Sequence, residues 1–158
     1  MTAAPQPEPE IDRLASGAAT GDAEMIARLL ATIGPMLVRY CRARLGRRGD
    51  SYRDADDVAQ EVGYAVLASV PAYAGGPFLR VMHEIATKIV DEVQPAATNG
   101  GVELSDLLPN LSALDRDVVV LRIATGLSTA ETGTILGLSP AEVRVAQHRA
   151  LSHLRSLL

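Results

Sequence analysis

The stretch of sequence that decides the fold is residues 127–158, LSTAETGTILGLSPAEVRVAQHRALSHLRSLL. Two of its serines stand eleven residues apart, and each of these is followed three residues later by a glutamate. This is the capping-box pattern that begins many helices, and the two pairs are Ser128 with Glu131 and Ser139 with Glu142. Gly137 lies between the pairs and lets the chain turn sharply after a short first helix. The spacing predicts a helix-turn-helix.

The longer helix of this motif is expected to have a buried face and a basic face. Small and apolar residues recur at helical spacing and predict the buried stripe, namely Val143, Ala146, Ala150, Leu154 and Leu157. Polar residues lie outside the stripe, with Arg144, His148 and Arg155 on one face and Gln147 and Arg149 flanking it. In a major groove, arginine pairs with guanine and glutamine with adenine. The pattern indicates a DNA-reading helix; the alternative is a helical hairpin with a solvated basic face.

The composition favours helices in the rest of the chain as well. Hydrophobic residues make up 47% but aromatic residues only 3%, so Ala, Leu and Val must build the core. We find no alternating strand pattern and expect an all-α fold of two small helical domains. The formal net charge of −4 argues against a protein that coats nucleic acid indiscriminately, but it permits a locally basic reading surface.

We expect the chain to divide into four parts. Proline and glutamate near the start indicate a flexible N-terminal tail over residues 1–19, followed by a helical domain over 20–94. A stretch of Pro, Ala, Asn and Gly predicts a linker over 95–105, and the helix-turn-helix domain occupies 106–158.

Four helices are expected in the first helical domain. Asp22 is suited to cap the first helix, which Gly34 would end, and Pro35 is suited to open the second. The third is expected from about residue 53 to 70, and the fourth begins at Phe78.

An acidic row follows one face of the expected third helix, in the segment DADDVAQEV. Asp54, Asp57 and Glu61 stand at positions i, i+3 and i+7, with Gln60 beside them. Carboxylates so close repel one another unless a basic partner lies opposite, although a simple solvated face is the alternative. The pattern suggests no pocket or shifted pKa of the kind that acid–base catalysis requires, so we expect no catalytic residue.

The remaining chemistry-bearing residues point to no cofactor and no metal. Cys41 is the only cysteine, so a disulfide is impossible, and we expect inert packing there. His148 and His153 are five residues apart and do not share a helix face. The N-terminus lacks the pattern of a signal peptide, and no apolar run approaches the ~18 residues of a membrane helix. We therefore expect a cytoplasmic protein without membrane contact.

Taken together and in this order, these motifs resemble the extracytoplasmic-function (ECF) sigma factors of the sigma-70 family. DADDVAQEV resembles the polymerase-binding motif of their region two, and residues 108–155 resemble region four over its full length. PMLVRYCRARLG fits the helix before the acidic motif. The resemblance covers roughly residues 20–93 and 104–157 and implies a non-enzymatic factor that directs bacterial RNA polymerase to promoters.

The resemblance also assigns site residues and partners. In the family, the surface that docks to the clamp helices of the polymerase β′ subunit corresponds to Asp56, Asp57, Gln60 and Glu61. The recognition-helix positions that meet the promoter −35 element correspond to Arg144, Val145, His148 and Arg149, and Gln147 lies among them. The partners implied are RNA polymerase core, through β′ and the β flap, promoter DNA and an anti-sigma protein.

Between the two matching regions the sequence departs from the family. The family captures −10 bases flipped from the duplex, but Tyr73 and Phe78 are the only local aromatics for stacking, and both also suit a core. The fourth helix has no positive charge after Lys88 and ends in Asp91 and Glu92, which do not favour phosphates.

The expected linker is also short. Eleven residues reach at most about 40 Å, whereas promoter elements lie more than one duplex turn of ~34–36 Å apart. These departures leave an alternative, a degenerate sigma-like regulator that binds polymerase or a partner without autonomous −10 recognition. A second alternative is a helix-turn-helix regulator that acts independently of polymerase.

Overall fold

The computed structural model describes residues 7–93 and 101–158, which contain helices and no strand. The N-terminal unit consists of α1 (Glu10–Ala19), α2 (Ala23–Leu45), α3 (Arg53–Ser69) and α4 (Phe78–Asp91), with the short helix η1 (Val70–Ala72) after α3. The C-terminal unit consists of α5 (Leu104–Leu107), η2 (Leu108–Asn110), α6 (Ala113–Val119), η3 (Val120–Ala124), α7 (Thr129–Leu136) and α8 (Pro140–Ser156). The expected all-α fold of two helical domains is confirmed.

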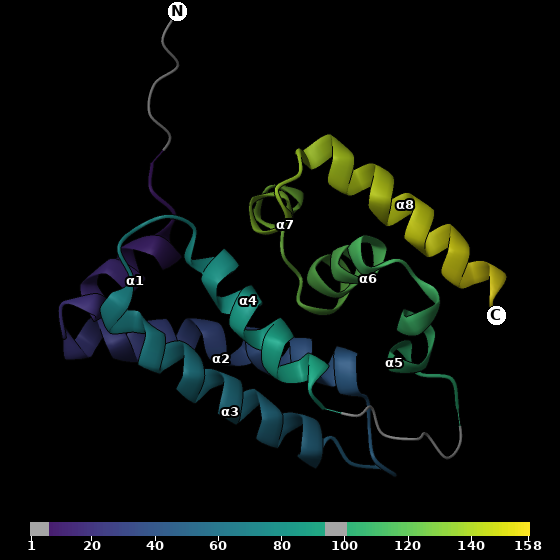
Figure 1. The fold of residues 1–158 in the computed structure, drawn as a ribbon, viewed down its shortest axis with the longest axis horizontal. Coiled ribbons are helices and arrows are strands. Elements are labelled where there is room, and N and C mark those ends of the chain that lie inside the picture. Colours follow the sequence, from purple (N-terminus) through teal and green to yellow (C-terminus); the bar gives the residue numbers. More distant parts are fainter. Residues whose placement is uncertain (1–6, 94–100) are drawn as a thin grey trace, which may run out of the picture.

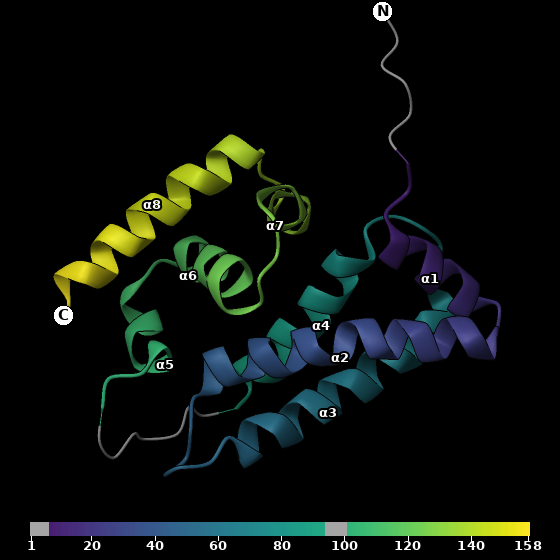
Figure 2. The same ribbon diagram turned by 180° about the vertical axis from the view of Figure 1, so that it is seen from behind.

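The N-terminal unit is built around α2, the longest helix. Figures 1 and 2 show α1, α3 and α4 gathered along it, and its buried stripe includes Leu29, Ile33 and Leu37. Val62 of α3 and Phe78 of α4 complete the core and are completely buried. This arrangement leaves one long side of α3 facing solvent.

The N-terminal boundary of this unit needs correction. The prediction of a flexible tail over residues 1–19 is wrong for 10–19, which form α1, and residues 1–6 lie outside the described residues. Leu14, Ala15 and Ala18 of α1 are buried against the unit. The Asp12 carboxylate accepts a hydrogen bond from the backbone N–H of Phe78 at 2.9 Å, and so holds the start of α4. The proline-rich beginning obscured the helical spacing that follows it.

The expected break at Gly34 is also wrong, although the predicted cap is confirmed. Oδ1 of Asp22 accepts hydrogen bonds from the backbone N–H groups of Glu24 and Met25. The helix then continues through Pro35 to Leu45. A proline inside a helix removes one hydrogen bond and crowds the residue before it, which here is a glycine without a Cβ. Burial of the α2 stripe on both sides of Pro35 outweighs this local cost.

The C-terminal unit follows the sequence prediction closely. The side chains of Ser112, Ser128 and Ser139 each accept a backbone hydrogen bond at the start of a helix. Gly137 has the left-handed φ of 71° that the turn requires. A Cβ on Gly133 would lie 2.4 Å from the carbonyl oxygen of Leu138, so α7 and the turn approach each other closely. The predicted helix-turn-helix is confirmed.

The two units pack against each other in this structure. They share one hydrophobic core, to which Leu108, Val120 and Leu121 contribute from the C-terminal side. Arg80 of α4 also donates a hydrogen bond to the carbonyl oxygen of Thr134 in α7. The linker was predicted over 95–105, but α5 already begins at Leu104. Residues 94–100 lie outside the described part of the chain.

Candidate protein-binding and nucleic-acid interfaces

The acidic row lies on the solvent-facing side of α3. Buried residues recur along the opposite side of this helix, namely Ala55, Ala59, Val62 and Val66. Their spacing turns Asp57, Gln60 and Glu61 outward, and all three are exposed. Neither Asp57 nor Glu61 makes an ion pair among the described residues. These carboxylates are therefore available to a basic partner.

Asp56 is placed differently from its neighbours. Arg42 of α2 donates two hydrogen bonds of 2.8 Å to the two carboxylate oxygens of Asp56. These bonds favour the charged form, so the pKa of Asp56 is lowered. Asp54 is likewise paired with Arg48 at 3.1 Å. Asp56 thus ties α3 to α2 and stands at the edge of the exposed face.

Tyr64 extends this face and was missed by the sequence reasoning. Its side chain is 72% exposed, which is unusual for an aromatic residue in a helix with a buried stripe. The available signal was its spacing, because Tyr64 stands seven residues after Asp57, on the same side of the helix. The acidic face is hereafter Asp57, Gln60, Glu61 and Tyr64.

On α8, the predicted reading residues fall into two groups. Val143, Ala146, Ala150 and Leu154 form the buried stripe, whereas Leu157, which was expected in it, lies beyond the helix end and is 42% exposed. Arg144, Val145 and His148 are exposed on the outer surface. They form a surface that can enter a groove without first breaking a contact.

Gln147 and Arg149 are instead held by other residues of the unit. Arg122 of η3 donates a hydrogen bond of 3.0 Å to Oε1 of Gln147. Both carboxylate oxygens of the buried Asp115 accept hydrogen bonds from Nε and Nη2 of Arg149. Arg122 occupies one of the two lone pairs of Oε1, so Gln147 keeps its amide group and one acceptor site for adenine while Arg122 fixes its orientation. Arg149 keeps its Nη1 group for an outside acceptor.

The aromatic residues Tyr73, before α4, and Phe78, at its start, pack against each other. Phe78 is completely buried, and the ring of Tyr73 meets it edge-on with the ring centroids 5.5 Å apart. The acidic end of α4 also has an internal partner, because Asp91 accepts a hydrogen bond from Arg44 of α2. The residues that departed from the family pattern therefore have structural roles in this unit.

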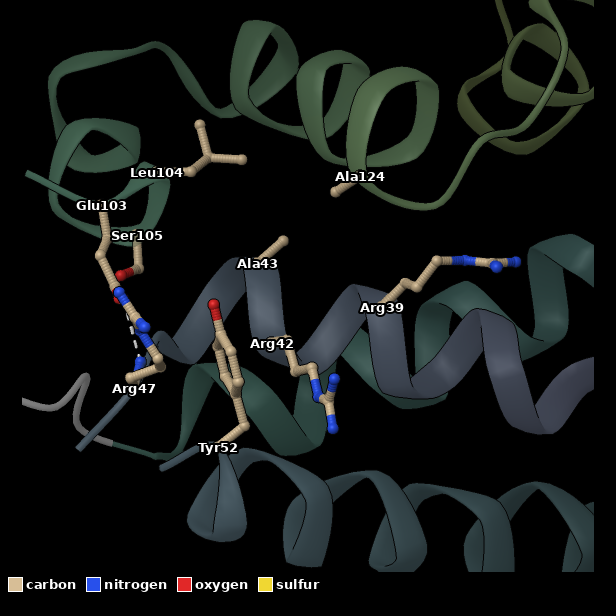
Figure 3. A pocket seen from close by; sticks show the side chains of 9 residues that line it. All are labelled: Arg39, Arg42, Ala43, Arg47, Tyr52, Glu103, Leu104, Ser105 and Ala124. Atoms are coloured by element: carbon tan, nitrogen blue, oxygen red, sulfur yellow. Dashed lines mark hydrogen bonds and ion pairs between the residues drawn. The ribbon is translucent and has the colours of Figure 1, made fainter. Parts of the chain in front are cut away.

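A cavity of about 410 Å³ lies where α2 meets the C-terminal unit. Figure 3 shows Arg42, Arg47 and Tyr52 on its α2 side, and Glu103 and Ser105 across from them. The two arginines lie over the tyrosine ring, with guanidinium carbons 4.8 and 5.6 Å from its centroid. Arg47 is also hydrogen-bonded to Glu103. These arginines already have partners, and the cavity marks the seam between the units.

The described residues show no other reactive centre. They contain no group of three or more His, Cys, Asp or Glu side chains placed to hold a metal. Cys41 is completely buried, and burial raises the pKa of its thiol to about 12, so the thiol is protonated at neutral pH. No helix in the described ranges is long and apolar enough to cross a membrane.

Comparison with known proteins relates the chain to one family. Residues 101–154 match the family described as Sigma-70, region 4. The ECF RNA polymerase sigma factor ShbA of Streptomyces griseus is 38% identical over 93% of this chain and 94% of its own length. The ECF RNA polymerase sigma factor SigD of Mycobacterium tuberculosis is 37% identical over 92% of this chain and 82% of its own length.

The chain belongs to the ECF RNA polymerase sigma factors. The structure of CnrH in complex with the cytosolic domain of CnrY agrees, with a TM-score of 0.72, 27% identity and coverage of 94% of this chain and 97% of that one. The chain is thus a sigma factor that directs RNA polymerase to promoters, and α7 and α8 form its region 4 helix-turn-helix. Neither alternative, a degenerate regulator or a polymerase-independent one, is favoured by these relatives.

Proposed function

We propose that this sigma factor binds polymerase core and promoter DNA through two separate helices of opposite charge. Asp57, Gln60 and Glu61 of α3 contact the β′ clamp helices, with Asp56 at the edge, held by Arg42. The observation that carries the proposal is that α3 exposes unpaired carboxylates while α8 exposes unpaired basic and apolar side chains. Charge complementarity of this kind selects a basic protein surface for one helix and DNA for the other.

The −35 element is read by residues of the N-terminal half of α8. Arg144 is free to pair with guanine, and the exposed Val145 suits the methyl group of thymine. His148 lies one turn further along the same helix. Arg149 contributes through its remaining Nη1 group, and Gln147 contributes through its amide group and the remaining lone pair of Oε1. The DNA-binding set is therefore Arg144, Val145, Gln147, His148 and Arg149.

The two units act as separate domains when polymerase is bound. Residues 7–93 form the polymerase-binding domain and 101–158 the −35-binding domain, with the β flap as a second polymerase contact of the latter. The promoter elements lie more than one duplex turn apart, so the packed units must separate along their seam. The protein has no catalytic role of its own and acts in the cytoplasm.

A second protein partner is supported by the structural neighbour. CnrH was solved in complex with the cytosolic domain of CnrY, and its likeness to this chain spans both units. We propose that this sigma factor has a comparable anti-sigma partner, which binds across the two units and covers the surfaces of α3 and α8.

Run-off transcription tests the central proposal. Core polymerase is mixed with the wild-type protein, Asp57→Arg or Arg144→Glu and a pool of random-sequence promoters. Specific transcripts that require both residues are the expected result. Asp57→Arg should lose polymerase binding, and Arg144→Glu should bind polymerase yet select no −35 sequence. Full activity of either variant would contradict the residue assignment.

A further inference from the structure

Gly63 lies in the middle of α3 without a local reason to be glycine. Glycine lowers helix stability relative to alanine, so a glycine in a helix interior calls for an explanation. A Cβ at this position would meet nothing closer than Cδ1 of Leu37, at 4.0 Å, which is ordinary van der Waals contact. Gly63 is not at a turn, and its φ is not positive. Packing within the chain therefore does not require glycine here.

The absent side chain opens a groove between α2 and α3. The groove has a volume of about 170 Å³, and Leu30, Leu37 and Ala59 give it apolar walls. Gly34 of α2 also borders it, but Gly34 precedes Pro35 and so has a backbone reason of its own. Leu30 is 36% exposed, which leaves apolar surface open to solvent. Figures 1 and 2 show α3 on the side of α2 that faces away from the C-terminal unit.

The groove is continuous with the acidic face of α3. Gln60 belongs to both, and Asp56 stands at the rim. Its volume is close to the ~150 Å³ of an apolar cavity that can hold benzene, so one leucine-sized or aromatic side chain fits. An apolar recess next to the exposed carboxylates of Asp57 and Glu61 matches a partner that offers an apolar side chain among basic ones.

We infer that this groove receives an apolar side chain of the polymerase surface that binds the acidic face. The inference rests on the proposed function, and it adds the anchor that fixes the complex. Interfaces gain most of their affinity from a few side chains in desolvated pockets, whereas exposed charges mainly speed association. The carboxylates of Asp57 and Glu61 attract the basic partner, and the groove slows its release.

Filling the groove tests the inference without removing a contact. Gly63→Leu places a side chain in the groove, and Thr32→Leu places a leucine on the exposed side of α2 opposite the groove. Leu30→Gln makes the groove wall polar. Each full-length variant is titrated with core polymerase, and its thermal unfolding is measured in parallel. Asp57→Arg is included to report on the acidic face independently.

The expected result separates binding from stability. Gly63→Leu and Leu30→Gln weaken polymerase binding about tenfold or more, mainly through faster dissociation, whereas Thr32→Leu changes it less than about twofold. Gly63→Leu unfolds at a temperature no lower than that of the wild type. If Gly63→Leu should fold poorly, Gly63→Ala combined with Leu30→Gln provides the same test.

Two other outcomes would separate a failure of the groove inference from a failure of the proposed binding face. If Asp57→Arg weakens binding while Gly63→Leu and Leu30→Gln bind as the wild type does, the groove is not an anchor and the inference is overturned. If Asp57→Arg binds normally, the proposed polymerase-binding face is wrong. Weaker binding by the groove variants alone would then keep the groove as the docking site without the acidic face.

Discussion

Helices α3 and α8 have the same length and a similar buried stripe, but they expose different chemistry to solvent. Each has 17 residues and buries a stripe of four, Ala55, Ala59, Val62 and Val66 in α3 and Val143, Ala146, Ala150 and Leu154 in α8. The helices differ in their outer surfaces, since α3 exposes free carboxylates whereas α8 has two of its five reading residues held by neighbours. The α3 carboxylates are free to meet a protein partner, whereas contacts within the C-terminal unit hold Gln147 and Arg149 in place before DNA binds.

The most damaging change we expect is a methyl group on Gly133. It would lie 2.4 Å from the Leu138 carbonyl oxygen, where only a backbone shift could make room. Gly133→Ala should lower the free energy of unfolding by about 3 kcal/mol, while Gly63→Ala on α3 should raise it by ~0.5–1 kcal/mol. Urea unfolding followed by circular dichroism measures both. Equal midpoints for the two variants would refute the close approach of α7 to the turn.

Removing one free side chain from α8 should weaken DNA binding without affecting the polymerase binding assigned to α3. Arg144→Ala should weaken binding of a −35 duplex by about 10- to 100-fold and reduce the salt slope of log K by about one. Binding to core polymerase should be unchanged. Arg155→Ala is the matched control, because Arg155 is exposed near the other end of the same helix. The same affinity loss in both variants would indicate a general charge effect instead of base reading.

The starts of the two helices offer a smaller test. Oγ of Ser139 accepts the backbone N–H of Glu142 at 3.1 Å, whereas α3 begins after Tyr52 without a side-chain cap. Ser139→Ala should cost about 1 kcal/mol of unfolding free energy. Ser156→Ala, at the far end of α8, removes a serine that is no N-cap and should cost less. Thermal unfolding of both variants measures the difference. Equal losses of stability in the two variants would show that the Ser139 cap does not stabilise α8.

The smallest expected effect concerns the pH dependence of the α2–α3 ion pair. The pKa of Asp56 is lowered in the folded protein because Arg42 donates hydrogen bonds to its charged form. Its contribution to stability is therefore complete above the unfolded-state pKa of ~3.9 and is lost as the pH falls towards the lower folded-state value. Solvent exposure of the pair keeps this contribution small. In Asp56→Asn, the free energy of unfolding should fall less steeply as the pH is lowered below about 4. The same decrease in the variant and the wild type would contradict a role of Asp56 in acid stability.

The two units also differ in how far the sequence predicted them. Ser128, Glu131 and Gly137 act within a few residues of themselves, so their roles were visible in the sequence and are confirmed. The continuity of α2 through Pro35 and the helix before Asp22 depend on burial against distant segments, and both were predicted wrongly. Caps and turns can thus be predicted from a single sequence, whereas packing between distant segments cannot.

The same limit applies to the site residues. The exposed positions on α3 and α8 follow from helical periodicity, and their roles as contacts stay predictions. The partners of Gln147 and Arg149, namely Arg122 and Asp115, stand 25 and 34 residues away, and no local pattern links them. The groove at Gly63 could not be predicted either. A glycine leaves a groove only where a neighbouring helix supplies the other wall, and the sequence does not show that α2 packs there.

The bond between Asp12 and the backbone of Phe78 has a consequence for synthesis of the chain. It joins two residues 66 positions apart, so the N-terminal unit cannot close until the start of α4 has left the ribosome. Until then α1 lacks the partner that its carboxylate needs, and the nascent chain exposes apolar surface. The corresponding bond of the C-terminal unit, between Asp115 and Arg149, joins residues only 34 positions apart. A pause in synthesis before the start of α4 has left the ribosome would thus prolong the exposure of this apolar surface.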